Sequence, residues 1–113
     1  MHELGLMQNI VDTVQDHARA NSVQKIMKVI LEVGKVSGVV PESLEFCFEI
    51  CTKDTALEGA ELEIQSVAAV ARCKGCGQEF DLVESDFSCP TCEDSEWDMV
   101  SGRELIIKGL EVI

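Results

Sequence analysis

The chain has 113 residues, six cysteines and a formal net charge of −12, and 46% of its residues are hydrophobic. This length allows one compact unit or two small ones, and the apolar content with only two prolines excludes a disordered chain. The apolar runs are shorter than the ~20 residues that a membrane-spanning helix needs, and the chain opens without a basic leader. We therefore expect a cytoplasmic protein without membrane insertion, whose cysteines serve metal or redox chemistry.

Two helices are predicted in the first half of the chain. The first covers residues 3–20, and the second begins at Pro41, because proline is favoured in the first turn of a helix. Helical spacing gives each segment one apolar stripe. The stripe of the first helix is Leu4, Met7, Val11, Val14 and Ala18, and that of the second is Leu44, Cys47, Phe48 and Cys51, widened by Phe46 and Ile50.

Three strands are predicted from alternating apolar residues. The first covers residues 25–36, and the second follows a turn at Gly59. The last follows Gly102, is irregular near Gly109 and is too apolar to stand alone, so we expect it to pair with the strands that precede the cysteine motifs. Their apolar residues are Met27, Val29, Leu31 and Val33 in the first, Leu62 and Ile64 in the second, and Leu105, Ile107, Leu110 and Val112 in the last.

Two Cys-x-x-Cys pairs, Cys73 with Cys76 and Cys89 with Cys92, are separated by twelve residues. A two-residue spacer lets both thiolates of a pair turn onto one metal, and two such pairs complete the tetrahedral sulfur site that Zn²⁺ prefers. We interpret the four cysteines as ligands of a structural zinc ion, with two disulfides or an iron site as the alternatives. Cys47 and Cys51, on an apolar helical stripe, are interpreted as core residues.

These elements predict an α+β fold in which two helices pack on a small three-stranded sheet, with an inserted zinc-ribbon module that holds its metal through four cysteines. The expected domains are an α/β domain of residues 1–70 plus 100–113 and an inserted zinc-binding domain of residues 71–99.

The segment around the cysteines is strongly acidic, and between Cys73 and Met99 the only basic residue is Lys74. Phosphate binding depends on Lys and Arg displacing counterions, so we expect no nucleic-acid partner; a cationic ligand or a basic protein surface suits this charge better. The acidic residues are Glu79, Asp81, Glu84, Asp86, Glu93, Asp94, Glu96 and Asp98.

The first three residues, Met1-His2-Glu3, can act as a chelator. The α-amine of Met1, the backbone nitrogen of His2 and its imidazole can bind one metal through adjoining rings. The backbone nitrogen of Glu3 or its carboxylate can complete a plane, which is the geometry that Ni²⁺ and Cu²⁺ favour. Taken alone, a histidine at position 2 is equally compatible with an ordinary flexible terminus.

The Met-His-Glu start, the segment "ILEVGKVSGVVPESLEFCFE", the two cysteine pairs and the tail "GRELIIKGLEV" together resemble the HypA/HybF hydrogenase-maturation nickel chaperones. The resemblance extends over essentially the whole chain. It implies that nickel is carried at the N terminus, with His2 as the principal ligand and Glu3 beside it, and that Cys73, Cys76, Cys89 and Cys92 hold zinc.

The resemblance also implies a function: delivery of Ni(II) to the large subunit of a [NiFe]-hydrogenase during maturation, together with a nickel-handling GTPase, and in some relatives service to urease. We expect no enzyme, because the sequence has neither a nucleophile–base pair nor a phosphate-binding Gly-Lys-Ser/Thr motif. The main alternative is a zinc-ribbon adaptor that only docks proteins. A rubredoxin-like iron carrier is a weaker one, since few aromatic residues surround the cysteines. The fourth nickel ligand stays open, because the only other histidine is His17.

Overall fold

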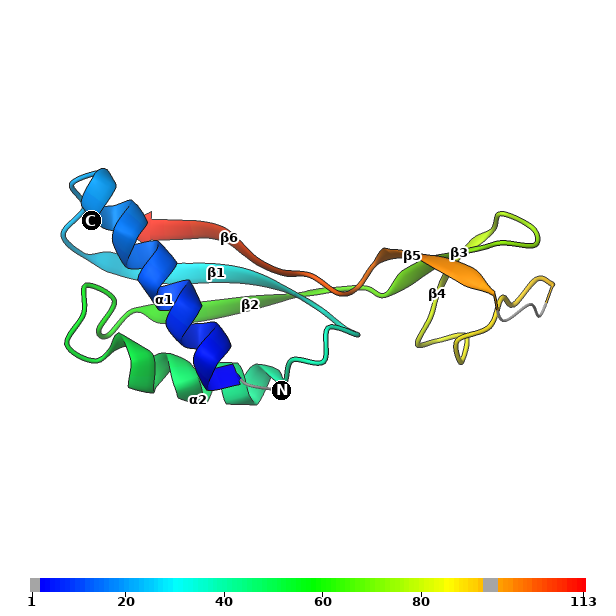
Figure 1. Cartoon of the computed structure of the whole chain (residues 1–113), viewed down its shortest axis with the longest axis horizontal. Coiled ribbons are helices and arrows are strands. Elements are labelled where there is room, and N and C mark those ends of the chain that lie inside the picture. The colour runs from blue at the N-terminus through cyan, green and yellow to red at the C-terminus, as the bar shows by residue number, and fades with distance from the viewer. Residues whose placement is uncertain (1–2, 93–95) are drawn as a thin grey trace.

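The protein is elongated and contains two small sheets placed one after the other along its long axis (Figure 1). It measures 54 × 25 × 17 Å. This computed structural model describes residues 3–92 and 96–113. The elements are α1 (Glu3–Ala20), β1 (Ile26–Gly34), α2 (Pro41–Thr52), β2 (Glu61–Val67), β3 (Val70–Cys73), β4 (Glu79–Asp81), β5 (Trp97–Ser101) and β6 (Leu105–Val112).

The first sheet has the strand order β2-β1-β6. β1 and β2 are parallel, which requires a crossover connection, and α2 provides it. β6 pairs antiparallel with β1, so that Val29 lies between Leu62 of β2 and Leu110 of β6. The prediction that the last strand pairs with one that precedes the cysteines is confirmed, as is the irregularity near Gly109, where the β1–β6 register shifts.

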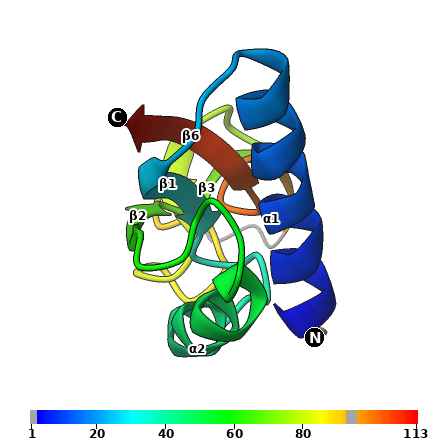
Figure 2. The same cartoon turned by 90° about the vertical axis from the view of Figure 1, so that its left-hand side faces the viewer.

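Both helices cover the same face of this sheet (Figure 2), and the main hydrophobic core lies between them. α1 spans the predicted residues 3–20, and α2 begins at Pro41 as predicted. Among the described residues, neither helix is long and apolar enough to cross a lipid bilayer. The helical side chains that the core buries include Met7, Val11, Val14 and Ala18 of α1 and Leu44, Cys47, Phe48 and Cys51 of α2.

Three residues assigned to the helical stripes are exposed instead. The exposed fractions are 52% for Leu4, 67% for Phe46 and 53% for Ile50. The buried side of α2 is already filled by the residues from Leu44 to Cys51 that face α1 and the sheet, and Phe46 and Ile50 lie beyond its edge. The expectation that Phe46 and Ile50 widen the buried stripe of α2 is therefore wrong.

Met27 is also exposed, by 45%, although strand alternation places it with Val29 on the buried face. The cause is a bulge. Ile26 pairs with Val112 and Lys28 pairs with Glu111, so Met27 has no partner in β6 and the alternation is broken there. Ile26 takes the buried position in its place.

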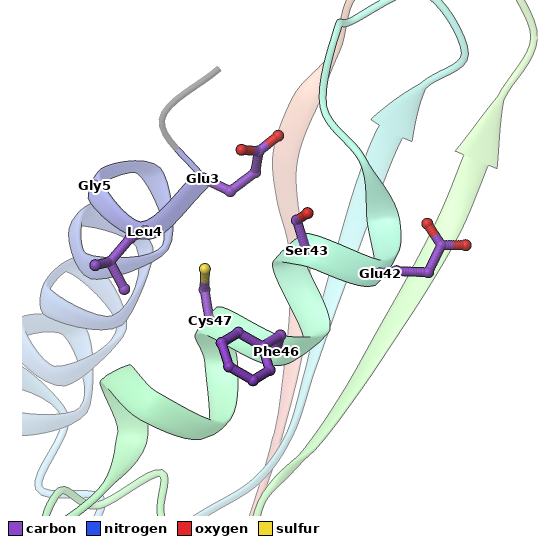
Figure 3. Close-up of a pocket in the computed structure, with 7 residues that line it drawn as sticks. All are labelled: Glu3, Leu4, Gly5, Glu42, Ser43, Phe46 and Cys47. Atoms are coloured by element: carbon purple, nitrogen blue, oxygen red, sulfur yellow. The ribbon is translucent and has the colours of Figure 1, made fainter.

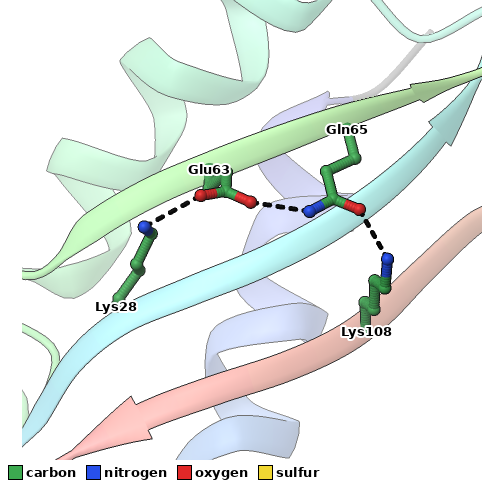
Figure 4. A network of polar contacts seen from close by, with 4 residues as sticks. All are labelled: Lys28, Glu63, Gln65 and Lys108. Carbon is green, nitrogen blue, oxygen red and sulfur yellow. Dashed lines mark hydrogen bonds and ion pairs between the residues drawn. The ribbon is translucent and has the colours of Figure 1, made fainter.

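A chain of polar contacts crosses the uncovered face of the first sheet (Figure 4). Lys28 Nζ lies 2.8 Å from Glu63 Oε1, Gln65 Nε2 donates to Glu63 Oε2 over 2.7 Å, and Lys108 Nζ donates to Gln65 Oε1 over 2.7 Å. The hydrogen bond from Lys28 lowers the pKa of the Glu63 carboxyl. These contacts join β1, β2 and β6 on the side that no helix covers.

The second sheet has the order β4-β3-β5 and carries the cysteine motifs. Both of its pairings are antiparallel. It has its own small hydrophobic cluster, against which Val36, Trp97 and Met99 pack. The buried members are Ala69, Ala71, Cys73, Phe80, Leu82 and Cys89.

The two sheets meet where the chain after β1 crosses the chain between β5 and β6. Gly34 N donates to Glu104 O over 2.8 Å, and Val36 N donates to Gly102 O over 2.9 Å. A Cβ on Gly34 would lie 2.0 Å from the carbonyl oxygen of Gly102. A Cβ on Gly102, whose φ is +122°, would lie 2.6 Å from the Cα of Ala69. The backbones therefore approach as closely as only glycine permits.

We expect Gly34→Ala to destabilise the fold by about 1–3 kcal/mol, the range for an overpacked site, because the added methyl meets backbone atoms that cannot rotate away. Urea denaturation followed by circular dichroism measures this change. Gly5→Ala is the matched control, since a Cβ there would meet no atom within 4 Å beyond its chain neighbours and the backbone of its own helix, and alanine favours a helix. Equal stability of Gly34→Ala and wild type would contradict the close crossing.

Candidate metal centres

The first cysteine pair lies in the turn between β3 and β4. Cys73 is the last residue of β3, and its carbonyl accepts a hydrogen bond from Gly77 N over 2.9 Å, while Cys73 N donates to Gln78 O over 2.9 Å. Gly77 has a φ of +76°, a conformation that favours glycine. This tight turn brings Cys76 back beside Cys73.

The second pair follows a stretch without regular structure that is fixed by local hydrogen bonds. Asp81 Oδ1 accepts from the backbone nitrogens of Val83 and Glu84 over 3.0 Å each. Phe87 N donates to Leu82 O over 2.8 Å, and Leu82 is fully buried. These contacts direct the chain back toward β3, so that Cys89 enters the cluster of the second sheet.

The four sulfur atoms converge on one point. The Sγ atoms of Cys73, Cys76, Cys89 and Cys92 all lie within 4.8 Å of one another. Cys73 Sγ is 3.3 Å from Cys92 Sγ, and Cys76 Sγ is 3.6 Å from Cys89 Sγ. Zinc–sulfur bonds of about 2.3 Å in a tetrahedron separate the sulfurs by roughly 3.8 Å, so this donor set and its spacing suit a zinc ion.

One cysteine of each pair is buried and the other is exposed. Cys73 and Cys89 are buried by 98% and 99%, whereas Cys76 and Cys92 are exposed. Trp97 packs against the cluster that contains the two buried cysteines, and its Nε1 donates to Phe87 O over 3.1 Å. The four-cysteine centre is therefore held in the hydrophobic cluster of the second sheet on one side and is open to solvent on the other.

The surroundings shift the pKa values of Cys76 and Cys89 in opposite directions. Backbone N–H groups, first that of Cys92, lower the pKa of the Cys89 thiol to about 7. For Cys76 the N–H of Gln78 acts in the same direction, but desolvation and the neighbouring thiols of Cys89 and Cys73 outweigh it and raise its pKa. Metal binding requires thiolates, so the lowered pKa of Cys89 favours metal binding, whereas the raised pKa of Cys76 opposes it.

The acidic charge of this module is barely neutralised. Lys74 Nζ lies 3.8 Å from Asp98 Oδ1, and Arg72, just before the first cysteine, bonds Glu79 over 2.7 Å. Its basic side chains are thus already paired with its own carboxylates. The described part of this surface offers no cationic patch of the kind that phosphate binding needs.

Of the three residues in the predicted N-terminal nickel motif, the structure describes only Glu3, and Met1 and His2 lie outside the described residues. Glu3 is the first residue of α1. It lines an open cleft of about 800 Å³ between the first turns of the two helices, together with Ser43 and Cys47. The Cys47 thiol points toward the start of α1 (Figure 3). Glu3 Oε2 accepts a hydrogen bond from Val40 N over 3.4 Å.

The neighbourhood of Glu3 could not be found from the sequence. No periodic pattern relates Glu3 to Val40 or Cys47, which lie about forty residues away in the chain. The first turn of α1 lies beside α2 and apart from the second sheet (Figure 1). The two candidate centres are thus built on different parts of the fold.

Comparison with known proteins gives consistent results for sequence and fold. The family model described as "Hydrogenase/urease nickel incorporation, metallochaperone, hypA" matches residues 1–112. Proteins named hydrogenase maturation factor HypA are similar throughout: that of Desulfosudis oleivorans is 47% identical over 114 residues, covering 99% of this chain and 98% of its own length. That of Geotalea uraniireducens is 45% identical over 112 residues, covering 99% of each.

Solved structures show the same fold at lower identity. The solution structure of the nickel metallochaperone HypA from Helicobacter pylori aligns with a TM-score of 0.71 at 23% identity and covers 100% of this chain and 98% of that one. A second HypA solution structure gives a TM-score of 0.75, also at 23% identity, with 100% and 97% covered. From the match to nearly every residue and the identities above 40%, the chain belongs to the HypA family of hydrogenase maturation metallochaperones.

Proposed function

We propose that this protein binds Ni(II) at its N terminus and delivers it to the large subunit of a [NiFe]-hydrogenase during maturation. The observation that carries the proposal is the family match from residue 1 to residue 112, which includes the Met1-His2-Glu3 motif. The family description also names urease, which makes urease a second client to test. A nickel-handling GTPase is the proposed partner in delivery, and the reducing cytoplasm, where thiols stay free, is the proposed compartment.

The proposed nickel ligands are the α-amine of Met1, the backbone nitrogen and imidazole of His2, and a group of Glu3. These are nitrogen and oxygen donors that suit planar Ni²⁺. The start of α1 lies at an open cleft, and a carrier must release its cargo, which an exposed chelate allows more readily than a closed cage. Met1 and His2 precede α1, and the first buried core residue that the structure describes is Met7, so replacing His2 should leave the core intact.

The proposed role of the four-cysteine centre is structural. Cys73, Cys76, Cys89 and Cys92 would hold Zn²⁺, and residues 71–99 would form a zinc-binding domain inserted into an α/β domain of residues 1–70 plus 100–113. When bound, zinc would crosslink the turn after β3 to the segment before β5. The second sheet has only a small cluster of its own, so the crosslink supplies stability that its side chains lack.

Replacing His2 with Ala should abolish stoichiometric nickel binding and leave the zinc content and the circular dichroism spectrum unchanged. Calorimetric titration with Ni²⁺ alone and elemental analysis measure both. His17→Ala is the matched control: it removes the only other imidazole of the chain, on the exposed side of α1. If His2→Ala still binds one nickel ion tightly, the N-terminal chelate is wrong and the metal is held elsewhere. A wild-type protein that binds no nickel would instead favour the protein-docking adaptor.

Extending the chain by a short Gly-Ser segment before Met1 should weaken nickel binding although His2 is intact, because the α-amine becomes an amide that donates far less readily to a metal. The same segment added after Ile113, which is 85% exposed, should have no effect. Affinity and absorption spectrum that are unchanged by the N-terminal extension would remove the α-amine from the ligand set.

Cys89→Ala should release zinc and unfold the second sheet while β1, β2 and the helices stay folded. Structural zinc contributes on the order of 10–16 kcal/mol in small peptides, more than the few apolar residues of this module can replace. Elemental analysis and amide NMR spectra report the two effects. Cys47→Ala, which removes a buried thiol outside the cluster, should retain full zinc. Full zinc occupancy in Cys89→Ala would exclude a four-thiolate site.

A further inference from the structure

Glu3 forms a contact between the two helices that its place in the nickel motif does not require. Its Oε2 atom accepts the backbone N–H of Val40 over 3.4 Å. Val40 is the residue that precedes α2, and its carbonyl accepts the first hydrogen bond of that helix, from Leu44 N over 3.1 Å. The contact therefore joins the first residue of α1 to the N-terminal end of α2.

The N-terminal end of α2 lacks the side-chain acceptors that usually bond the free backbone N–H groups at the start of a helix. The first N–H groups of a helix have no partner within it, and in a capping box the residue three places after the N-cap returns a carboxylate to the N-cap N–H. Here that place holds Ser43, and the N-cap is a valine without a side-chain hydrogen bond. Glu3 supplies the missing carboxylate from another helix, at the end where the helix dipole favours negative charge.

A second contact fixes the same turn of α1. The Cys51 thiol lies 3.9 Å from the carbonyl oxygen of Leu4, and Met7, one turn later, is fully buried. Adjacent residues of α1 are thus attached to the beginning and to the last turn of α2. The His2–Glu3 peptide bond joins α1 at a residue that is held by its side chain.

We propose that Glu3 is a positioning residue for nickel, which acts by accepting the Val40 N–H and so holds in place the residue to which the proposed ligands Met1 and His2 are bonded. The inference rests on the proposed function, since it assumes that nickel binds at the N terminus. It assigns the Glu3 carboxylate to Val40 and not to the metal. Residue 40, which the sequence places far from the motif, then controls nickel affinity.

The decisive variant is Val40→Pro, which removes the donor and changes no proposed ligand. The backbone of Val40 is extended, with φ −94° and ψ 116°, close to the range that proline adopts, and its carbonyl can still bond Leu44. Val40→Ala is the matched control, because it keeps the N–H and shortens a side chain that is 48% exposed. Calorimetric titration of the zinc-loaded full-length protein with Ni²⁺ alone measures affinity, and the absorption bands of planar nickel report its geometry.

We expect Val40→Pro to weaken nickel binding about tenfold, the lower end of the range for lost partners of metal ligands, with altered absorption bands. Val40→Ala should stay within about twofold of wild type on the same reasoning. Glu3→Gln should lose less nickel affinity than Glu3→Ala, because its amide oxygen can accept the same N–H, whereas Glu3→Ala should match Val40→Pro. The double variant Glu3→Ala/Val40→Pro should be no weaker than either single one, as expected for two halves of one contact.

Wild-type affinity in a folded Val40→Pro would overturn the inference, and so would a loss in Glu3→Gln as large as in Glu3→Ala, which would make the carboxylate a ligand. If circular dichroism shows that Val40→Pro does not fold, the comparison of Glu3→Gln with Glu3→Ala decides alone. Failure of the proposed function is distinct: wild type would bind no nickel, or His2→Ala would bind it undiminished.

Discussion

The close crossing of two backbone segments at Gly34 and Gly102 determines how the rest of the molecule is arranged. Here β1 ends, the loop to α2 starts, and the chain returns from the second sheet to β6. Because neither residue has a side chain, the backbones can bond directly, with Val36 N donating to Gly102 O. Val36 then packs on the cluster of the second sheet, and Val40, at the end of the same loop, contacts Glu3. The loop of residues 35–40 therefore contacts the cluster of the second sheet at its start and Glu3 at its end.

Most of the two helices and the first sheet is predictable from the sequence because the signals for these elements are local. The periodicity of residues 3–20, the proline at the start of α2 and the alternation around Leu62 and Ile64 each report a backbone conformation directly. The same reasoning is wrong where tertiary structure decides. Met27 is turned outward by a bulge against β6, and Phe46 is exposed because α2 is covered on one side only. Neither the bulge nor the coverage leaves a pattern in the chain.

The cysteine centre was predictable for a different reason. The spacing within each pair fixes a turn, and the chemistry of four thiols requires that the pairs face each other. The spacing does not say which sulfurs are buried; burial of Cys73 and Cys89 follows from β3 and from the packing of Trp97 and Leu82. The surroundings of Glu3 lie beyond any sequence argument, because Val40 approaches it only once α1 and α2 have packed together.

The pairing of β3 with β5 has a consequence for how the first sheet folds. β6 must pair with β1 across the 70 residues between Gly34 and Leu105, and the entropy lost on closing such a loop grows with its length. Because Val70 pairs with Ser101, a folded second sheet shortens the flexible connection between β2 and β6 to a few residues. A tenfold shortening lowers the closure cost by about 2 kcal/mol. A metal bound far from β6 would thus favour docking of that strand without touching it, and loss of the metal would loosen the C-terminal strand as well as the second sheet.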